Sequence, residues 1–588
     1  MEMSKIFFGS NPYSSAPVII YKINIDKRTY FNAKKACLQI INHFPECFSD
    51  MNLSNLEPKI YIGTVLSEFS KYLINDNNGY VKSSGVTIND GLILIWVEFH
   101  YPQLTNKAIK LVLEIFQLLM RGDVLSDRYI KNLLNSFNKF CYKFHAESTP
   151  FFEISKDDDI PMMPYGRNGY WQFGWGKLSI IFMKSSSMED SYYGVKDSMN
   201  KEISIDILRG IGLSTAKSIV IDKIIELENA VKSIGYPCVI KPIRGTHGEG
   251  ITSNIKNYNE LKIAYKHAKK SYYGHNPILV EAFIQGDDYR IMVANGQFLG
   301  AVKRRPSYVI GNGKLTLKEL IYNLNEVRAD FKLNPNHLKL IPIDDFLVTH
   351  LNRQRISLDD VIEKDKVITL SSIANYSSGG IVEDVTDLVH PQIKHMSELI
   401  AQSSGIATLG VDYITTDISK PYYEVDGAIT EYNHLPSSGL VSFLANPKDS
   451  LRKILNIGSG RIPVVVAIID SSRITQAQNW CKKNIQDKTV GWACVDDVYI
   501  GQLPLQVTDT SGWEIAKILL RNKTVEKALF ICSDEEIMIK GLPVDKAEYI
   551  FINDINLTYE WDKVINKSAK KVKMFSDIES LLSFALKD

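Results

Sequence analysis

Short apolar runs alternate with stretches of helical spacing along almost the whole chain. The runs "APVIIYKINI" and "GLILIWVEFHY" have the length and β-branched content of strands, whereas "NKAIKLVLEIFQLLM" repeats apolar residues every three to four positions. The same alternation returns near the C-terminus in "IPVVVAIID", "GWEIAKILLRN", "KALFICS" and "EYIFIN". This pattern predicts a multidomain protein of the α/β and α+β classes.

Two breaks in the pattern predict three domains. The first domain, residues 1–158, ends in the acidic, proline-bearing linker "SKDDDIPMMPYG". Residues 159–457 contain most of the glycine-rich loops and are predicted to form the catalytic domain. Residues 458–588 return to strand, helix, strand and are predicted to form a third, α/β domain. A chain of 588 residues is long enough for this number of domains.

Composition narrows the function classes. The chain has 68 Lys plus Arg against 67 Asp plus Glu, so no global charge indicates nucleic acid or membrane as a partner. The seven cysteines are scattered and none forms a CxxC pair, which argues against a disulfide framework and a zinc site and fits a cytoplasmic protein. No apolar run is long enough to span a bilayer, and the N-terminus lacks the apolar region of a signal peptide.

The stretch "YPCVIKPIRGTHGEG" places Lys241 at the end of a strand and a glycine-rich turn after it. Glycines let backbone N–H groups approach a phosphate, and lysine adds a positive charge. The stretch matches neither the GxxxxGK[ST] nor the GxGxxG pattern, so alone it is more typical of a hairpin turn on a mixed sheet. Its interpretation depends on the residues further along the chain.

Carboxylates that could contribute to a nucleotide site occur downstream. Glu281 ends a predicted strand and could accept from an adenine amino group, and Asp288 could bind ribose hydroxyls. Glu431 and Asn433 alternate on one strand and therefore point to one face, with Asp412 on a neighbouring predicted strand. Two carboxylates and an amide are hard oxygen ligands that suit Mg²⁺. Glu281 and Asp288, each taken alone, are more typical of a solvated strand end, whereas the apolar context of Asp412 and Glu431 argues against a merely solvated sheet face.

Taken in this order, the segments resemble the ATP-grasp superfamily and, more narrowly, the cyanophycin synthetases. The resemblance is densest from about residue 195 to 440. The matching stretches are "NKEISIDILRGIGL", "IGYPCVIKPIRGTHGEGIT", "GDDYRIMVANGQFLGAVKRRPSYVIGNGKLTLKELI", "NYSSGGIVEDVTDLVHP" and "GVDYITTDISKP". The resemblance implies a glutathione-synthetase-like catalytic domain that binds ATP and Mg²⁺ and joins a carboxylate to an amine through an acyl phosphate.

The resemblance also implies roles for individual residues at matched positions. Those implied to hold ATP are Lys201, Lys241, Gly245, Gly248, Gly250, Glu281, Phe283 and Asp288. Those implied to bind Mg²⁺ are Asp412, Glu431 and Asn433. Those implied to act on the reacting groups are Arg290, Arg304 and His247, and those implied to line the acceptor site are Ser377, Ser378 and Gly379.

Three departures from the family bear on function. The P-loop of the family's Mur-ligase-like half reads Ile469 to Thr475 here, without its glycines and with Arg473 in place of the lysine. The third domain is therefore predicted to be a degenerate, truncated Mur-ligase-like domain without a P-loop. The first domain has no histidine between His43 and His100, so a zinc hydrolase site is not supported. The acceptor stretch at 371–380 has lost two positive charges, which leaves the substrate open.

Three functions remain open from the sequence. The first is a ligase that polymerises β-Asp-Arg dipeptides into cyanophycin or a related peptide, in the manner of the second type of cyanophycin synthetase. The second is a peptide ligase of a small-molecule pathway, and the third is a nucleotide-binding pseudoenzyme that acts as an assembly partner. The expected partners are an amino acid or dipeptide, a peptide acceptor and further copies of the chain in a dimer or larger homo-oligomer.

Overall fold

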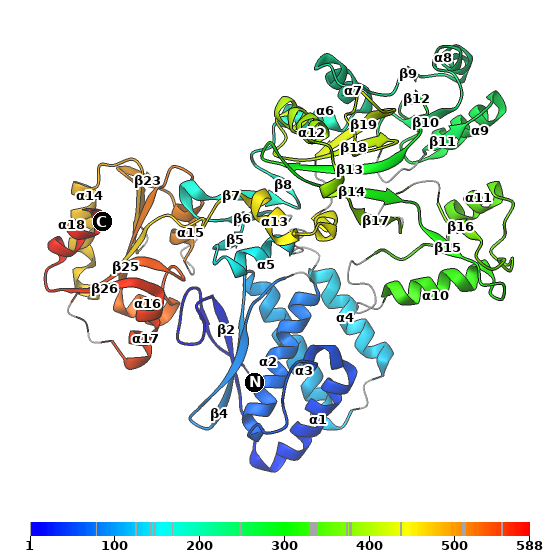
Figure 1. The fold of residues 1–588 in the computed structure, drawn as a ribbon. Helices are drawn as coiled ribbons and strands as arrows, with labels where there is room; N and C mark the ends of the chain where they lie inside the picture. Colours follow the sequence, from blue (N-terminus) through cyan, green and yellow to red (C-terminus); the bar gives the residue numbers. More distant parts are fainter. Residues whose placement is uncertain are drawn as a thin grey trace. The chain divides into compact units, whose positions relative to one another are not determined.

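The structure, a computed structural model, resolves the chain into two compact units: Met1–Lys184 with Ile457–Asp588, and Ser185–Asn456 (Figure 1). The predicted domain limits at 158 and 457 stay a prediction, but residues 159–184 lie in the first unit. The structure describes residues 2–587 apart from 78, 124–125, 142–143, 145–148, 167–168, 246–249, 330–337, 372–373, 375–378, 435–437, 496, 508–512, 554 and 556.

The N-terminal part of the first unit is an antiparallel sheet of order β1-β2-β4-β3 with helices on one face. Inward side chains of the sheet, such as Ile19 and Ile95, share a core with Phe69 and Val112 of the helices. Its strands are β1 (Glu2–Phe7), β2 (Val18–Ile23), β3 (Ser84–Asn89) and β4 (Leu92–Glu98). Its helices are α1 (Tyr30–His43), α2 (Pro58–Asp76), α3 (Pro102–Arg121), α4 (Asp127–Cys141) and α5 (Thr149–Asp157).

The C-terminal part of the first unit is a seven-stranded sheet of order β23-β22-β21-β24-β20-β25-β26. The strands from β21 to β26 in this order are parallel, as the predicted alternation of strand and helix requires. The strands are β20 (Val464–Ile469), β21 (Val490–Cys494), β22 (Asp497–Ile500), β23 (Leu503–Leu505), β24 (Lys527–Ser533), β25 (Ala547–Asn553) and β26 (Ala569–Phe575). The helices are α14 (Ile474–Asn484), α15 (Glu514–Arg521), α16 (Asp534–Lys540), α17 (Tyr559–Ser568) and α18 (Ile578–Lys587).

These two parts of the first unit share one hydrophobic core. Val18 and Ile20 of β2 point away from helices α1 to α3 and join Val464 and Val466 of β20 in a single buried cluster. The short antiparallel strands β5 (Met162–Pro164), β6 (Trp171–Phe173) and β7 (Ile180–Met183) of this unit come after the N-terminal part in the chain, and β8 (Ser186–Ser187) belongs to the second unit. The C-terminal segment therefore buries the face of β2 that the N-terminal helices leave uncovered.

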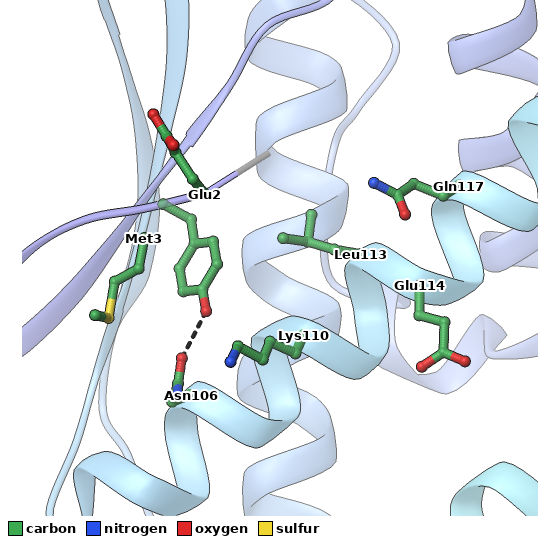
Figure 2. Close-up of a pocket in the computed structure, with 8 residues that line it drawn as sticks. Glu2, Met3, Asn106, Lys110, Leu113, Glu114 and Gln117 are labelled. Atoms are coloured by element: carbon green, nitrogen blue, oxygen red, sulfur yellow. Dashed lines mark hydrogen bonds between the residues drawn. The ribbon is translucent and has the colours of Figure 1, made fainter.

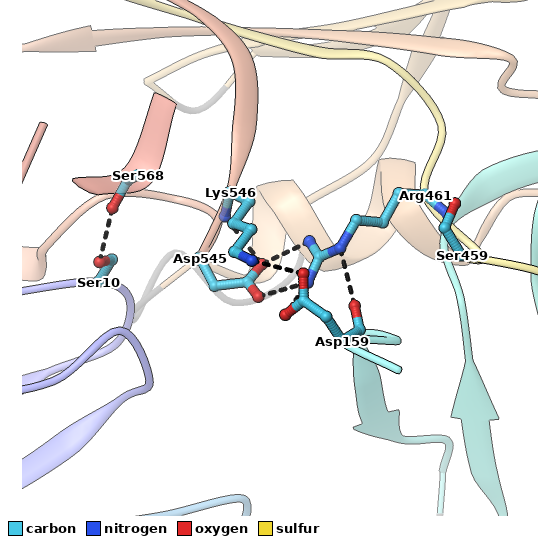
Figure 3. Close-up of polar contacts among 7 residues, drawn as sticks. All are labelled: Ser10, Asp159, Ser459, Arg461, Asp545, Lys546 and Ser568. Atoms are coloured by element: carbon cyan, nitrogen blue, oxygen red, sulfur yellow. Dashed lines mark hydrogen bonds and ion pairs between the residues drawn. The ribbon is translucent and has the colours of Figure 1, made fainter. Parts of the chain in front are cut away.

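A polar cluster holds three chain segments of the first unit together (Figure 3). The Arg461 guanidinium donates to both carboxylate oxygens of Asp545, at 2.9 and 2.7 Å, and its Nε donates to the Asp159 carbonyl at 3.0 Å. The guanidinium also lies 4.8 Å from the Trp175 ring centroid. Lys546 adds a 2.5 Å ion pair with Asp159. Because the Arg461 side chain is only 16% exposed, its bonds to Asp545 are largely shielded from water, whereas the side chains of the Lys546–Asp159 pair are more than half exposed.

We expect Arg461→Met to lower the free energy of unfolding of the first unit by about 2 kcal/mol, since it removes a bidentate ion pair and leaves Asp545 with fewer donors. Urea unfolding followed by tryptophan fluorescence measures the change. The control is Lys177→Met, which breaks an ion pair with Glu526 whose side chains are 61% and 47% exposed. That pair should contribute at most about 0.5 kcal/mol. Equal effects of the two variants would contradict the assignment.

The second unit contains two larger sheets, one of four strands and one of five. The four-stranded sheet, of order β11-β10-β12-β9, consists of β9 (Ser218–Ile221), β10 (Cys238–Pro242), β11 (Thr252–Ile255) and β12 (Ile278–Ala282). The five-stranded sheet, of order β17-β14-β13-β18-β19, consists of β13 (Asp287–Ala294), β14 (Gln297–Arg305), β17 (Ile381–Asp384), β18 (Thr408–Thr415) and β19 (Gly427–His434). The helices of this unit that border the two sheets are α6 (Tyr192–Ser198), α7 (Lys201–Gly210), α8 (Leu227–Ile234), α9 (Tyr258–Lys270), α12 (Pro391–Ser404) and α13 (Pro447–Leu455).

An insertion comes after β14 in the chain and has a core of its own. It consists of the ribbon β15 (Tyr308–Ile310) and β16 (Val367–Thr369) with helices α10 (Leu317–Ala329) and α11 (Asp345–Arg353). Val309 and Ile368 of the ribbon pack against Leu317 and Leu351 of the helices. In the part of the chain that the structure describes, no helix is long and apolar enough to cross a membrane.

Candidate functional site

Charged side chains meet on one face of the five-stranded sheet because neighbouring antiparallel strands bring them into register. Asp288 of β13 lies opposite Arg304 of β14, and Arg290 of β13 lies opposite Asp412 of β18. The Arg304 guanidinium is 2.5 Å from Asp288 Oδ1 and 2.8 Å from Asp412 Oδ1, and Arg290 Nε is 3.2 Å from the same Asp412 oxygen. Arg290 and Arg304 therefore both contact Asp412, and Arg304 also contacts Asp288.

The three residues predicted to bind Mg²⁺ lie together beside this cluster. Asp412 of β18 is opposite Glu431 of β19. The Asn433 amide nitrogen donates to Glu431 Oε1 at 2.8 Å and to Asp412 Oδ2 at 3.2 Å. Lys201 Nζ of α7 is 3.2 Å from Glu431 Oε2. The predicted pairing of two strands and the common face of Glu431 and Asn433 are both present in the structure.

The surroundings of Asp412 and Glu431 shift the pKa values of the two carboxyl groups in opposite directions. Burial raises the pKa of Asp412 and outweighs the opposing effect of Arg290 and Arg304. Burial acts in the same direction on Glu431, but Lys201, Lys241 and the Asn433 bond overcome it and lower its pKa to about 2. Glu431, whose side chain is 24% exposed, is thus held as a carboxylate, which is the form that a metal ligand requires.

The predicted glycine loop connects two antiparallel strands, so it is a hairpin connection as well as a candidate phosphate loop. Strands β10 and β11 pair with Cys238 opposite Ile255. Lys241 forms a 2.7 Å ion pair with Glu281 of β12, and the two side chains are only 7% and 5% exposed. Gly245 accepts a bond from Lys201 Nζ at its carbonyl, at 3.2 Å. Lys201, Lys241 and Glu281 therefore connect the loop to both sheets of the second unit.

The glycines on either side of residues 246–249 of this loop have backbone angles that other residues rarely adopt. Gly245 has φ +143° and Gly250 has φ +74°, and a Cβ at Gly250 would lie 2.9 Å from Ser271 Oγ and 3.0 Å from Pro242. Side chains are strained at such angles. Gly248 and the predicted catalytic His247 lie outside the described residues, as do Ser377 and Ser378 of the acceptor stretch.

Phe283 and Gly379 are described, and their surroundings limit what each can contribute. The Phe283 N–H donates to the Pro237 carbonyl at 3.1 Å, so a contact with adenine would have to use the carbonyl or the ring of Phe283. The Gly379 carbonyl accepts a bond from Arg328, a residue that the sequence did not single out. The sequence signal available for Arg328 was weak, because an arginine near the end of an amphipathic helix is ordinarily solvent-exposed.

The stretch predicted to correspond to the family's P-loop, Ile469 to Thr475, makes hydrogen bonds within the first unit. After β20, the Asp470 carboxylate accepts a bond from the Ser472 N–H at 2.9 Å and so caps the helical turn Ser471–Arg473 that precedes α14. The Arg473 guanidinium donates to Asn553 at 2.9 Å. A carboxylate at the N-terminus of a helix occupies the position where a phosphate would otherwise be favoured.

The first unit also has a hollow of about 320 Å³ between β1 and α3 (Figure 2). The Tyr21 hydroxyl donates to Asn106 Oδ1 at 2.6 Å in it. The hollow is lined by Glu2, Met3, Tyr21, Asn106, Lys110, Leu113, Glu114 and Gln117. None of these is a predicted site residue.

Among the described residues, no group of three or more His, Cys, Asp or Glu side chains gathers as a metal centre. The Mg²⁺ prediction instead uses two carboxylates with an amide.

Comparison with known proteins identifies a domain family within the second unit. Residues 206–295 match the ATP-grasp domain family, a range that contains Lys241, Glu281, Asp288 and Arg290. The chain is 31% identical to the cyanophycin synthetase of Synechocystis over 434 residues, which are 70% of this chain and 49% of that protein. The chain therefore contains an ATP-grasp domain and is similar to cyanophycin synthetases over most of its length. The predicted resemblance and the α/β fold class are thereby confirmed.

Other relatives share smaller parts of this cyanophycin synthetase-like chain. The cyanophycin synthetase of Geminocystis herdmanii is 33% identical over 66% of this chain and 45% of its own length. The bifunctional glutathione biosynthesis protein of Mannheimia succiniciproducens is 29% identical over 41% of this chain and 32% of its own length. A crystal structure of a bifunctional glutathione synthetase from Pasteurella multocida is similar at a TM-score of 0.39 and 21% identity, over 60% of this chain and 52% of that one. The chain spans about half the length of the cyanophycin synthetases that it matches.

Proposed function

We propose that this protein is an ATP-dependent ligase that joins a carboxylate to an amine through an acyl phosphate, with release of ADP. The observation that carries the proposal is the convergence of Arg290, Arg304 and Lys201 on two carboxylates, those of Asp412 and Glu431, from five elements of one unit. Phosphoryl transfer requires little covalent chemistry from a protein. It requires positive charge and alignment at the transferred group, which this cluster provides.

Individual residues would divide the work by position. Lys201 and Lys241 are placed to neutralise phosphate charge, since both lie beside the carbonyl or strand end from which the glycine loop begins. Asp288 is held by Arg304 and is placed to bind the ribose hydroxyls of ATP. Arg290 and Arg304 would stabilise the charge that develops on the acyl phosphate. His247, Gly248, Ser377 and Ser378 retain their predicted roles as part of this proposal.

The donor set fits Mg²⁺. Asp412, Glu431 and Asn433 offer carboxylate and amide oxygens, and Asp412 Oδ1 is buried without a hydrogen bond of good geometry. The Asn433 amide would turn its oxygen toward the ion, because its nitrogen now lies between the two carboxylates. A bound Mg²⁺ would screen the phosphate oxygens and orient them for transfer. Lys201 keeps Glu431 ionised in the absence of the ion.

The proposed substrate is a β-Asp-Arg dipeptide or a related short peptide, added to a peptide acceptor. Its support is the similarity to cyanophycin synthetases, which extends over 70% and 66% of this chain. A peptide ligase for another small molecule is the second candidate, because the acceptor stretch at 371–380 has lost two positive charges. A nucleotide-binding pseudoenzyme is disfavoured, since Lys241, Asp288, Asp412, Glu431 and Asn433 are all present. Lys241 is paired with Glu281 and Asp288 with Arg304, and Asn433 bonds both Asp412 and Glu431.

The decisive experiment is turnover with a substrate panel. Purified protein, Mg-ATP and single amino acids, β-Asp-Arg and short Asp-Arg peptides are incubated, and released phosphate and product mass are recorded. Condensation that depends on β-Asp-Arg supports the first candidate, and condensation with another amine supports the second. Nucleotide binding without condensation of any tested pair would favour the pseudoenzyme instead. The predicted homo-oligomer is tested on the same sample by light scattering.

We expect the chain to bind one ATP per protomer. The second unit retains its phosphate-binding lysines, whereas Asp470 caps the helical turn where the P-loop of the first unit would lie. Equilibrium binding of a fluorescent ATP analogue should give a stoichiometry near one. Lys241→Met should abolish it, and Arg473→Met, which changes the degenerate loop, should leave it unaltered. A residual site in Lys241→Met that is lost on changing Arg473 would show that the first unit also binds nucleotide.

A further inference from the structure

Arg328 lies inside the second unit, where an arginine side chain is unusual. It belongs to the last turn of α10 and is 7% exposed. Its Nη1 donates to the Lys339 carbonyl at 2.6 Å and to the Gly379 carbonyl at 2.8 Å. One side chain thus joins helix α10, the segment before α11, and the end of the predicted acceptor stretch, which lies 51 residues further along the chain.

Gly379 is shaped to receive this guanidinium. It has φ +79°, and a Cβ placed on it would lie 2.9 Å from Arg328 Nη1 and 3.0 Å from Ile341. Any larger residue would therefore be strained and would displace the arginine. Since the peptide unit is planar, a fixed Gly379 carbonyl also fixes the direction of the Gly380 N–H, which points away from Arg328.

The same peptide leads directly into the charged cluster. Strand β17 begins at Ile381, and Val382 pairs with Arg304 of β14. The backbone from Gly379 to Val382 is therefore held at one end by Arg328 and at the other by the strand that carries a cluster arginine. A segment fixed at both ends is pre-organised for binding, because its conformational entropy is already lost before substrate arrives.

We propose that Arg328 is a positioning residue for the acceptor substrate: it holds the carbonyl of Gly379 so that the end of the acceptor stretch keeps one conformation next to Arg304. The proposal rests on the proposed ligase function and names the residue that controls acceptor binding in it. Arg328 acts through the backbone of Gly379 and not on the reacting atoms. Its loss should therefore raise KM for the acceptor without changing KM for ATP.

The test compares Arg328→Met, Arg328→Lys and the wild type. We expect Arg328→Met to raise KM for the acceptor about 10-fold or more, with KM for ATP within about twofold of the wild type. Arg328→Lys keeps a charged donor but lacks the planar guanidinium that fixes the direction of both bonds, so it should restore part of the affinity. Hydrogen exchange measured by mass spectrometry should show faster exchange in peptides that cover 379–384 of the methionine variant.

The matched control is Asn325→Ala, one turn earlier on α10. Asn325 donates to the Ile341 carbonyl at 2.9 Å and accepts from the Ile341 N–H at 2.8 Å, so it anchors the same neighbouring segment without the Gly379 bond. It should leave KM for the acceptor within about twofold of the wild type. Circular dichroism and thermal unfolding establish that each variant is folded before kinetics are compared.

Each outcome decides one of the two proposals. Unchanged exchange at 379–384 in Arg328→Met, or equal rises in KM for ATP and acceptor, would overturn the positioning role. An Asn325→Ala variant as impaired as Arg328→Met would overturn it too, since anchoring of the insertion alone would then suffice. A wild type that exchanges as expected but condenses no substrate would instead overturn the ligase function. The Arg328–Gly379 bond would then have no role in acceptor binding.

Discussion

Glu431→Gln should reduce ATP-dependent condensation about 100- to 1,000-fold while leaving the protein folded. The substitution keeps the size of the side chain and removes its negative charge. Glu431 is held ionised by Lys201 and Lys241, with a pKa lowered to about 2, and it is the proposed Mg²⁺ ligand opposite Asp412. The neutral amide can bind neither the ion nor Lys201 with comparable strength. Phosphate release at saturating Mg-ATP and acceptor measures the loss.

The control for this prediction is Glu383→Gln on β17, in the same sheet. Glu383 pairs with Arg305 at 3.1 Å, and both side chains are more than half exposed. Its neutralisation should change turnover less than twofold, because an exposed ion pair contributes little. Glu431→Gln with wild-type turnover would remove Glu431 from the metal site. Turnover lost together with the cooperative thermal transition would instead indicate a structural role for the carboxylate.

The charged cluster shows what the sequence could and could not predict. The turn Asn295–Gly296 is typical of a two-residue hairpin, and β13 and β14 do form one, with Ala294 opposite Gln297. Continued without a break, that register would place Asp288 opposite Lys303. A bulge between Met292 and Val293 shifts the pairing by one residue, so Arg304 lies opposite Asp288. Bulges leave little trace in a single sequence, so this ion pair could not be predicted.

The domain organisation could be predicted only in part from the sequence, for a different reason. The periodicity of apolar residues predicted the strands and helices at both ends of the chain, because each element carries its own pattern. The core shared by Val18 and Ile20 with Val464 and Val466 joins the two ends of the chain, and no local pattern encodes such a contact. The β2 run "VIIYKI" was predicted only as a strand. In the structure it is buried at all positions but one, so it is covered on both faces.

The second large effect is expected at the buried ion pair of the four-stranded sheet. Lys241→Met should destabilise the second unit by about 3 to 5 kcal/mol, since it leaves Glu281 charged and desolvated between β10 and β12. Lys241→Met with Glu281→Met should recover most of this loss, because two apolar side chains of similar size suit a buried site. Hydrogen exchange of β10 and β12 in increasing urea measures the stability of this sheet separately from that of the first unit.

The exposed pair Lys232–Glu228 on α8 supplies the control, because its side chains are 68% and 59% exposed. Lys232→Met should cost less than about 0.5 kcal/mol. Stability and ATP binding should then separate in the double variant: the sheet recovers, but the nucleotide is still not bound, because the phosphate-facing charge of Lys241 is gone. A double variant as unstable as Lys241→Met would show that the ion pair itself stabilises the sheet. A stable double variant that still binds ATP would mean that Lys201 and the loop suffice for the phosphates, and Lys241 would then be present to pair with Glu281.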